Sequence, residues 1–220
     1  MRTIRALTTA LALVAALPVV VAAQHGRQFK DAWFWGIKGG GFAFADSGGQ
    51  YKTAPVGGVE WLITRTHGGL YVAASQAFLN TQTMFFADPS APDTVLRAID
   101  IKNVRKLDIA LMAFPGTHLR MHPYAGVGFT LLQAASATGR GPFTNQESFD
   151  ATQAQIEQSK VGFSPLLMVG TQYRLRLVSI FAQGMMSPAQ KNFIMYNGRP
   201  VNLTYEVGLR YNVGTSIAKE

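Results

Sequence analysis

The segment over residues 201–213 alternates strictly between apolar and polar side chains. Its odd positions are Val, Leu, Tyr, Val, Leu, Tyr and Val, and its even positions are Asn, Thr, Glu, Gly, Arg and Asn. Successive side chains of a β-strand point to opposite faces, so this strand has one wholly apolar face and one polar, charged face. A strand packed on the core of a soluble protein also fits the pattern. The rest of the chain decides whether the apolar face meets a protein core or lipid.

The beginning of the chain has the layout of a secretion signal. Two arginines fall in residues 1–5, residues 6–21 are mostly apolar, and Val21, Ala22 and Ala23 are small residues in front of Gln24. This layout predicts a signal peptide over residues 1–23, cleaved after Ala23. A membrane anchor is the alternative, but the apolar segment is short for a spanning helix of about 20 residues. Cleavage lowers the formal net charge from +8 to +6.

Composition narrows the environment further. The chain has no Cys, which excludes a lipid-modified lipoprotein, disulfides and thiolate metal sites. It has 22 glycines, 11% aromatic residues and a slightly positive mean hydropathy of +0.10. These values suit a transmembrane barrel, in which apolar residues occupy alternate positions of each strand. The basic residues are scattered, with no basic helix and no stacking motif, so we expect no nucleic-acid partner. An anionic membrane surface is the expected partner for part of the charge.

Strand-like segments and alternating loop lengths fill the chain. We expect strands at residues 33–45, 53–64, 68–80, 103–113, 119–133, 161–173, 177–186 and 201–213. The joins at 65–67, 115–118 and 174–176 are short, whereas those at 46–52, 81–102, 134–160 and 187–200 are longer and more polar. Short periplasmic turns and long extracellular loops are the pattern of outer-membrane barrels. The sequence therefore predicts an all-β, eight-stranded antiparallel up-and-down transmembrane β-barrel over residues 33–213.

The remaining segments receive simpler assignments. Residues 24–32 are predicted to be a periplasmic lead-in and residues 214–220 a short C-terminal tail. Residues 149–158 have few strand formers and predict a short helix in the third outer loop. Pro123 and Pro165 fall inside expected strands, where they indicate bulges or wrong boundaries, because proline cannot donate to the ladder. Aromatic residues at strand ends, among them Trp35, Tyr71 and Tyr211, predict girdles at the two membrane interfaces.

Several motifs resemble the bacterial outer-membrane β-barrel domain family, the small OmpA/OmpX-like barrels. They are Trp35-Gly36-Ile37-Lys38-Gly39-Gly40-Gly41, Leu107-Asp108-Ile109-Ala110-Leu111 and His122-Pro123-Tyr124-Ala125-Gly126-Val127-Gly128. The resemblance implies the outer membrane as location, with its lipid, lipopolysaccharide and assembly machinery as partners. The end of the last strand looks like the assembly signal of such proteins, with Gly208, Tyr211 and Val213 as its candidate residues. Family members often stop at a terminal aromatic residue, whereas this chain continues to Glu220.

Charged residues are predicted to face the inside of the barrel. The candidates for ion pairs in the lumen are Lys38, Glu60, Asp108, Arg120, Glu206 and Arg210. An eight-stranded barrel has an interior that side chains can fill, and buried charges must pair. One interpretation is structural neutralisation of the interior. The other is a gate whose ion pairs switch and pass small ions.

No constellation in the sequence indicates catalysis or metal binding. His118 and His122 share a strand face but lie roughly 13 Å apart on a strand, too far to bind one metal together, and we read them as interfacial residues. No His falls in the expected outer loops, where a hydrolase would need one beside its carboxylates. We therefore expect no catalytic residue, no metal, no cofactor and no enzyme.

Three functions remain open. The first is a non-enzymatic outer-membrane barrel with a structural or surface-interaction role, whose loops meet an unidentified surface ligand. The second is a small channel or carrier for ions or hydrophobic solutes. The third is a soluble periplasmic barrel of lipocalin type, in which Tyr205 and Leu209 would face a ligand and Glu206 and Arg210 would face water. A polar substitution at Leu209 distinguishes these functions. It would block membrane insertion of a structural barrel or a channel, whereas it would abolish ligand binding in the cavity of a soluble barrel.

Overall fold

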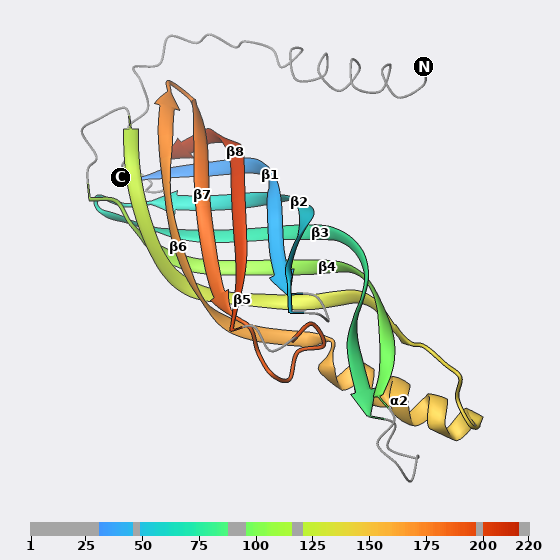
Figure 1. The fold of residues 1–220 in the computed structure, drawn as a ribbon. Coiled ribbons are helices and arrows are strands. Elements are labelled where there is room, and N and C mark those ends of the chain that lie inside the picture. Colours follow the sequence, from blue (N-terminus) through green and yellow to red (C-terminus); the bar gives the residue numbers. More distant parts are fainter. Residues whose placement is uncertain (1–30, 46–48, 88–95, 116–120, 197–199, 216–220) are drawn as a thin grey trace, which may run out of the picture.

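The protein is a closed antiparallel barrel in which each strand pairs with its neighbours in sequence (Figure 1). The computed structural model describes residues 31–45, 49–87, 96–115, 121–196 and 200–215, which contain eight strands. The strands are β1 Ala32–Ala45, β2 Tyr51–Thr64, β3 Gly68–Ala87, β4 Leu96–Ala113, β5 Met121–Gly139, β6 Val161–Leu175, β7 Val178–Pro188 and β8 Val201–Thr215. The pairing of Ile37 with Leu209 belongs to the β1–β8 ladder that closes the barrel. The predicted fold class is confirmed.

Up-and-down pairing puts the connections alternately at the two ends of the barrel. One end, here called the turn end, carries tight joins such as the one closed by the hydrogen bond from Arg65 N to Gly68 O at 2.7 Å. The start of β1 and the end of β8 also meet there, since Ala32 pairs with Thr215. The opposite end, the loop end, carries the β1–β2, β3–β4, β5–β6 and β7–β8 connections. The predicted signal peptide and residues 24–30 of the lead-in predicted at 24–32 lie outside the described residues, and Ala32 already belongs to β1.

The β3–β4 hairpin is much longer than the sequence pattern predicts. Residues 81–102 were expected to be a loop, but residues 81–87 and 96–102 continue the two strands beyond the barrel wall (Figure 1). The alternation changes phase near Asn103, which adopts a left-handed φ of 55°, so that Ile101 and Val104 are both buried. Asn tolerates this backbone region better than most residues. The expected boundary was therefore wrong because an irregularity interrupts the period of two.

The two prolines do not mark bulges. Pro123 pairs with Thr171 and Pro165 with Phe129, and the β5–β6 register runs without a shift. Both side chains point outward and are exposed. The β6–β7 ladder includes Leu167 but none of the residues before it, so Pro165 lies in a part of β6 that pairs only with β5. A missing N–H costs little where there is no second ladder to complete.

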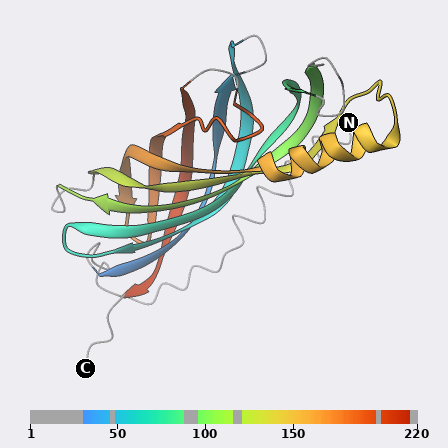
Figure 2. The same ribbon diagram turned by 90° about the horizontal axis from the view of Figure 1, so that it is seen from below.

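The single helix of the described residues, α2 Gln146–Ser159, lies at the loop end beside the extended hairpin (Figures 1 and 2). It confirms the helix expected at 149–158. Asn145 caps it by accepting a hydrogen bond from Ser148 N at 2.8 Å. The hydrogen bond from Lys160 holds the pKa of the Glu157 carboxyl below its usual value. No helix in the part of the chain that the structure describes is long and apolar enough to cross a membrane.

The outward face of the barrel carries a belt of large apolar side chains. Members between 50% and 66% exposed include Ile37, Val59, Leu111, Val127, Phe129, Phe163, Leu167, Val169 and Val207, with Phe78 of β3 at 53%. Three tryptophans pack together on the outside near the turn end. The ring centroid of Trp61 lies 5.6 Å from that of Trp33 and 6.0 Å from that of Trp35. Tyr71 departs from the predicted girdle, because it is fully buried inside the barrel.

Candidate functional site: a polar layer across the barrel

A connected layer of polar side chains fills the middle of the lumen, and every strand contributes to it. Going round the barrel, the contributors are Lys38, Glu60, Tyr71, Lys106 with Asp108, Tyr124, Gln172, Gln183 and Glu206 with Arg210. The alternation of each strand explains this convergence, because a residue facing inward on one strand meets inward residues of all the others in so narrow a barrel.

Arg210 organises one half of the layer. Its Nε donates to Glu60 Oε1, and its Nη1 donates to Gln172 Oε1 at 2.6 Å. The guanidinium also lies over the ring of Phe181, 4.0 Å from the centroid. Hydrogen bonds to a carboxylate and a stacked aromatic face are the contacts that suit a planar guanidinium. Arg210 is completely buried, so these contacts replace its hydration.

Lys38 organises the other half. Its Nζ donates to Glu206 Oε2 at 2.8 Å and to the Tyr71 hydroxyl at 3.0 Å. Asp108 lies between two ammonium groups, since its Oδ2 is 3.8 Å from Lys38 Nζ and 3.1 Å from Lys106 Nζ. Each of the two lysines therefore has a carboxylate neighbour, and Asp108 links them across the lumen.

Gln183 joins the two halves. Its Nε2 donates to Glu206 Oε2 at 2.8 Å and to the Tyr71 hydroxyl at 2.9 Å. Its Oε1 accepts from the Tyr124 hydroxyl at 2.9 Å and, at 3.4 Å, from Arg210 Nη2. One amide thus connects the Arg210 group to the Lys38 group, which makes the layer continuous across the barrel.

The charges in the layer balance. Lys38, Lys106 and Arg210 face Glu60, Asp108 and Glu206, and each of these residues is at most 6% exposed. An isolated buried charge is very costly, whereas a paired and hydrogen-bonded charge is tolerated. The described residues of the layer are thus neutral as a unit, and removing any one of these six charged side chains leaves an uncompensated charge in the lumen.

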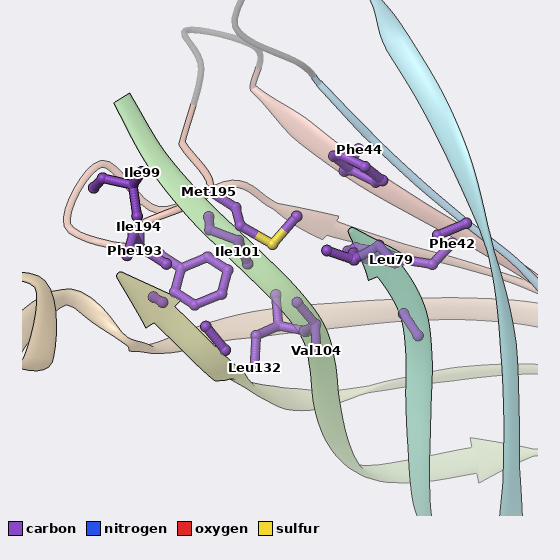
Figure 3. Close-up of a cluster of buried hydrophobic side chains, with 14 of the residues drawn as sticks. Phe42, Phe44, Leu79, Ile99, Ile101, Val104, Leu132, Phe193, Ile194 and Met195 are labelled. Atoms are coloured by element: carbon purple, nitrogen blue, oxygen red, sulfur yellow. The ribbon is translucent and has the colours of Figure 1, made fainter. Parts of the chain in front are cut away.

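Apolar clusters lie above and below the polar layer. At the loop end, Phe42, Leu79, Ile101, Val104 and Leu132 belong to a buried cluster that also contains Phe193, Ile194 and Met195 from the β7–β8 connection. Figure 3 shows Phe193 and Met195 beside Ile101, Val104 and Leu132. Ile194 N donates to Ser159 O at 2.9 Å, which ties this connection to the end of α2. Toward the turn end, a second cluster contains Phe34, Leu62, Met112, Phe114 and Met168.

The structure places five of the six predicted lumen residues in this layer, and Arg120 lies outside the described residues. Lys106, two positions before Asp108 on the same face, occupies the place of a third cation. Sequence reasoning placed Tyr124 inside the barrel but not in the polar network, and it missed Tyr71, Gln172, Gln183 and Thr204, of which Thr204 Oγ1 accepts from Lys106 Nζ at 3.2 Å. The available signal was a polar residue at an inward position of an otherwise apolar strand, as at Gln172 and Gln183.

The candidate assembly-signal residues run from the middle of β8, at Gly208, to its turn end, at Tyr211 and Val213. Tyr211 and Val213 point outward and are 51% and 47% exposed. Gly208 points inward under Phe181, where a Cβ would lie 2.6 Å from the ring and 2.2 Å from Ile37 O. Glycine at this position therefore has a packing reason, since it admits the ring on which Arg210 stacks.

The histidines do not form a metal site in the described residues. His122 is 1% exposed on the inner face of β5, which corrects its reading as an interfacial residue. His118 lies outside the described residues. Nowhere in the described ranges do three His, Cys, Asp or Glu side chains come together as metal ligands.

Comparison with known proteins yields structural likeness only. No family model and no curated protein matches the chain. Neisserial surface protein A has a TM-score of 0.50 at 12% identity, covering 81% of this chain and 96% of the other. Ail, the attachment invasion locus protein of Yersinia pestis, has 0.48 at 10% identity, covering 83% and 99%. The outer membrane protein OprG from Pseudomonas aeruginosa has 0.47 at 13% identity, covering 84% and 98%. The likeness to Neisserial surface protein A, at 12% identity, shows the fold alone, and it agrees with the closed barrel described above.

Proposed function

We propose that the protein is an integral outer-membrane barrel, without enzymatic activity, whose lumen is closed by the polar layer. One observation carries the proposal: the outward faces of the strands are apolar and the inward faces hold charged residues. Tyr205 and Leu209 point outward, and Glu206 and Arg210 are buried inside. This is the arrangement of a membrane barrel and the reverse of the one that a soluble ligand-binding barrel requires.

The barrel geometry supports insertion in lipid. The ladder between β1 and β8 closes the barrel, so wherever each strand has both neighbours the backbone hydrogen bonds are satisfied within the wall, as a bilayer interior demands. On β8 the outward apolar positions run from Leu203 to Val213, eleven residues whose ten steps span roughly 25 Å when the strand is tilted, the height of a membrane belt. The loop end, with α2 and the long β3–β4 hairpin, would face outside the cell, and the turn end would face the periplasm.

Stacked layers in the lumen favour a structural or surface role over conduction. A solute entering from outside would meet Phe193 and its apolar neighbours first, then the ion pairs of Lys38 and Arg210. The loop-end surfaces of α2 and the β3–β4 hairpin are then the parts left to contact a ligand at the cell surface.

The test combines location with conductance. Fractionation of the host should recover the protein in the outer membrane, with a band that migrates differently after boiling. In planar bilayers the folded protein should show no steady conductance at moderate voltage. Recovery as a soluble periplasmic protein would refute insertion, and a steady open channel would refute the closed lumen while leaving the location intact.

A carrier for hydrophobic solutes is the second candidate, favoured by the apolar lining of the lumen at the loop end. That lining is covered by Phe193, Ile194 and Met195, which belong to one connection. If the protein is a carrier, a fluorescent fatty-acid analogue should bind the folded wild-type barrel. The Phe193→Trp variant, with a larger side chain over the lining, should bind the analogue more weakly. The closed barrel predicts no saturable binding of the probe.

Assembly should depend on the outward aromatic end of β8. Tyr211→Ala combined with Val213→Ala is expected to slow folding by the purified assembly machinery several-fold, because both side chains are exposed where a receptor can read them. Unassisted folding into thin liposomes should change much less. The matched control is Tyr205→Ala with Leu203→Ala, the same loss of outward area near the other end of β8. Equal slowing by the two double variants would contradict an assembly signal at Tyr211 and Val213.

A further inference from the structure

One sector of the outward face carries polar side chains where the apolar belt ends. Gln76 of β3 pairs with Arg105 of β4, and Arg105 pairs with Gln133 of β5, so the three side chains form one row across three strands. All three point outward. The next row toward the turn end is apolar and consists of Ala74, Leu107 and Leu131.

A furrow begins beside this row. Gly57 of β2 pairs with both Gly39 and Gln76, and a Cβ on Gly57 would meet nothing closer than 3.8 Å. The outward wall is bare backbone at these two glycines. A groove of about 420 Å³ lies over this wall, with Gly57, Val59, Leu107 and Leu131 along it and Gln76, Arg105 and Gln133 at its polar side.

More cations continue the sector toward the loop end. Lys102 stands three residues before Arg105 on β4, about 10 Å along the strand. It lines a second, polar groove of about 600 Å³ with Lys52, Asn80, Asp100 and Arg140. Asp100 is the one acidic residue of that lining and lies 3.2 Å from Arg140 Nε. The lining therefore keeps a net positive charge.

The opposite side of the barrel lacks this pattern. In the loop-end halves of β1, β6, β7 and β8, the outward strand positions within the described residues carry no charge; they include Ala43, Phe163, Met186 and Leu203. A general interfacial ring of cations would surround the barrel. The cations instead gather at Arg105 and Lys102 of β4, with Lys52 of β2 and Arg140 just after β5, next to the furrow beside Gly57.

We propose that this sector is a docking site for one molecule of lipid A, the phosphorylated glycolipid of the outer leaflet. The inference rests on the proposed outer-membrane location and names a specific lipid partner within it. An acyl chain lies in the furrow against Val59, Leu107 and Leu131. A phosphate accepts hydrogen bonds from the Arg105 guanidinium, whose fork matches phosphate geometry. The amides of Gln76 and Gln133 donate to phosphate or sugar oxygens, and Lys102 meets the sugar side of the headgroup.

The experiment counts lipids retained by the purified full-length barrel. The protein, folded in zwitterionic detergent, is titrated with lipid A and separately with phosphatidylcholine, and complexes are counted by native mass spectrometry. The variants are Arg105→Gln, which removes the phosphate contact, and Gly57→Leu, which places a side chain in the furrow from a Cβ that meets nothing closer than 3.8 Å. Their controls are Arg176→Gln at the turn end and Gly184→Leu, an outward glycine of β7 with nothing within 4 Å of its Cβ position.

The wild type should retain one lipid A and prefer it over phosphatidylcholine. Arg105→Gln should weaken retention about tenfold because it removes one charge-assisted contact, and Gly57→Leu should weaken it about tenfold because it displaces part of the acyl chain from the furrow. The two controls should leave retention unchanged. Equal retention of both lipids, or loss shared by the controls, would overturn the docking site. Heat-modifiability of the same samples reports whether the barrel is folded. If the barrel folds in detergent and inserts in bilayers but does not prefer lipid A over phosphatidylcholine, the docking site is refuted and the proposed function is not. A protein that never inserts refutes the proposed function with it.

Discussion

Arg210→Ala is expected to destabilise the folded barrel by about 3–5 kcal/mol, the cost of breaking a buried ion pair. The substitution removes the hydrogen bonds to Glu60 and Gln172 and the stacking on Phe181. It leaves the Glu60 carboxylate, 2% exposed, without its cation inside the lumen. The free energy of unfolding, followed by tryptophan fluorescence in urea with the barrel in thin liposomes, measures the effect.

Two matched variants separate charge from packing. Arg65→Ala removes an exposed ion pair, in which Arg65 Nη1 lies 3.4 Å from Asp31 Oδ1. It should lower the free energy of unfolding by at most about 1 kcal/mol. Glu60→Gln combined with Arg210→Met removes both buried charges and should recover a large part of the loss, because replacing a buried pair by neutral groups is often tolerated. If Arg210→Ala costs no more than Arg65→Ala, water reaches the layer and the lumen is not closed.

The alternation in the sequence separates the two faces of a regular strand, and it says less about what the inward residues touch. On β8 the alternation predicts correctly that Tyr205 and Leu209 point outward and that Glu206 and Arg210 point inward. The period of two is a local property of an extended chain, which is why it can be read from sequence. It fails at Asn103, where a left-handed residue changes the phase, and so the long β3–β4 hairpin appears as a loop.

The partners within the layer could not be predicted because they depend on the stagger of the strands. Lys38 meets Glu206, 168 positions away, through the β1–β8 register that pairs Lys38 with Gly208. A shift of that register by two residues would keep every side chain on its face and give Lys38 a different neighbour. Tyr71 also depends on register. An aromatic residue near a strand end can belong to an interface girdle or to the lumen, and only the register of its strand decides between them. The pattern therefore predicts the composition of the layer better than its connectivity.

The sharpest test for lipid around the apolar belt is how the cost of an outward arginine, in free energy of unfolding, changes with its depth along the strand. Val207→Arg places a cation at the middle of the outward face of β8, where Val207 is 61% exposed. In a bilayer this should cost about 2–4 kcal/mol, whereas Val213→Arg near the turn end should cost about 0–1 kcal/mol. Unfolding free energies in liposomes, without assembly machinery, compare the two variants on the same strand.

The same pair of variants excludes a water-exposed belt if the depth dependence appears. An outward valine in water can be replaced by arginine at little cost, so Val207→Arg and Val213→Arg would then both be near neutral. A β8 packed against another protein would instead penalise both substitutions, since both side chains are about half exposed in the free barrel. Only a membrane makes the penalty fall along the strand from Val207 to Val213, because water and headgroups become reachable for the guanidinium as the interface approaches.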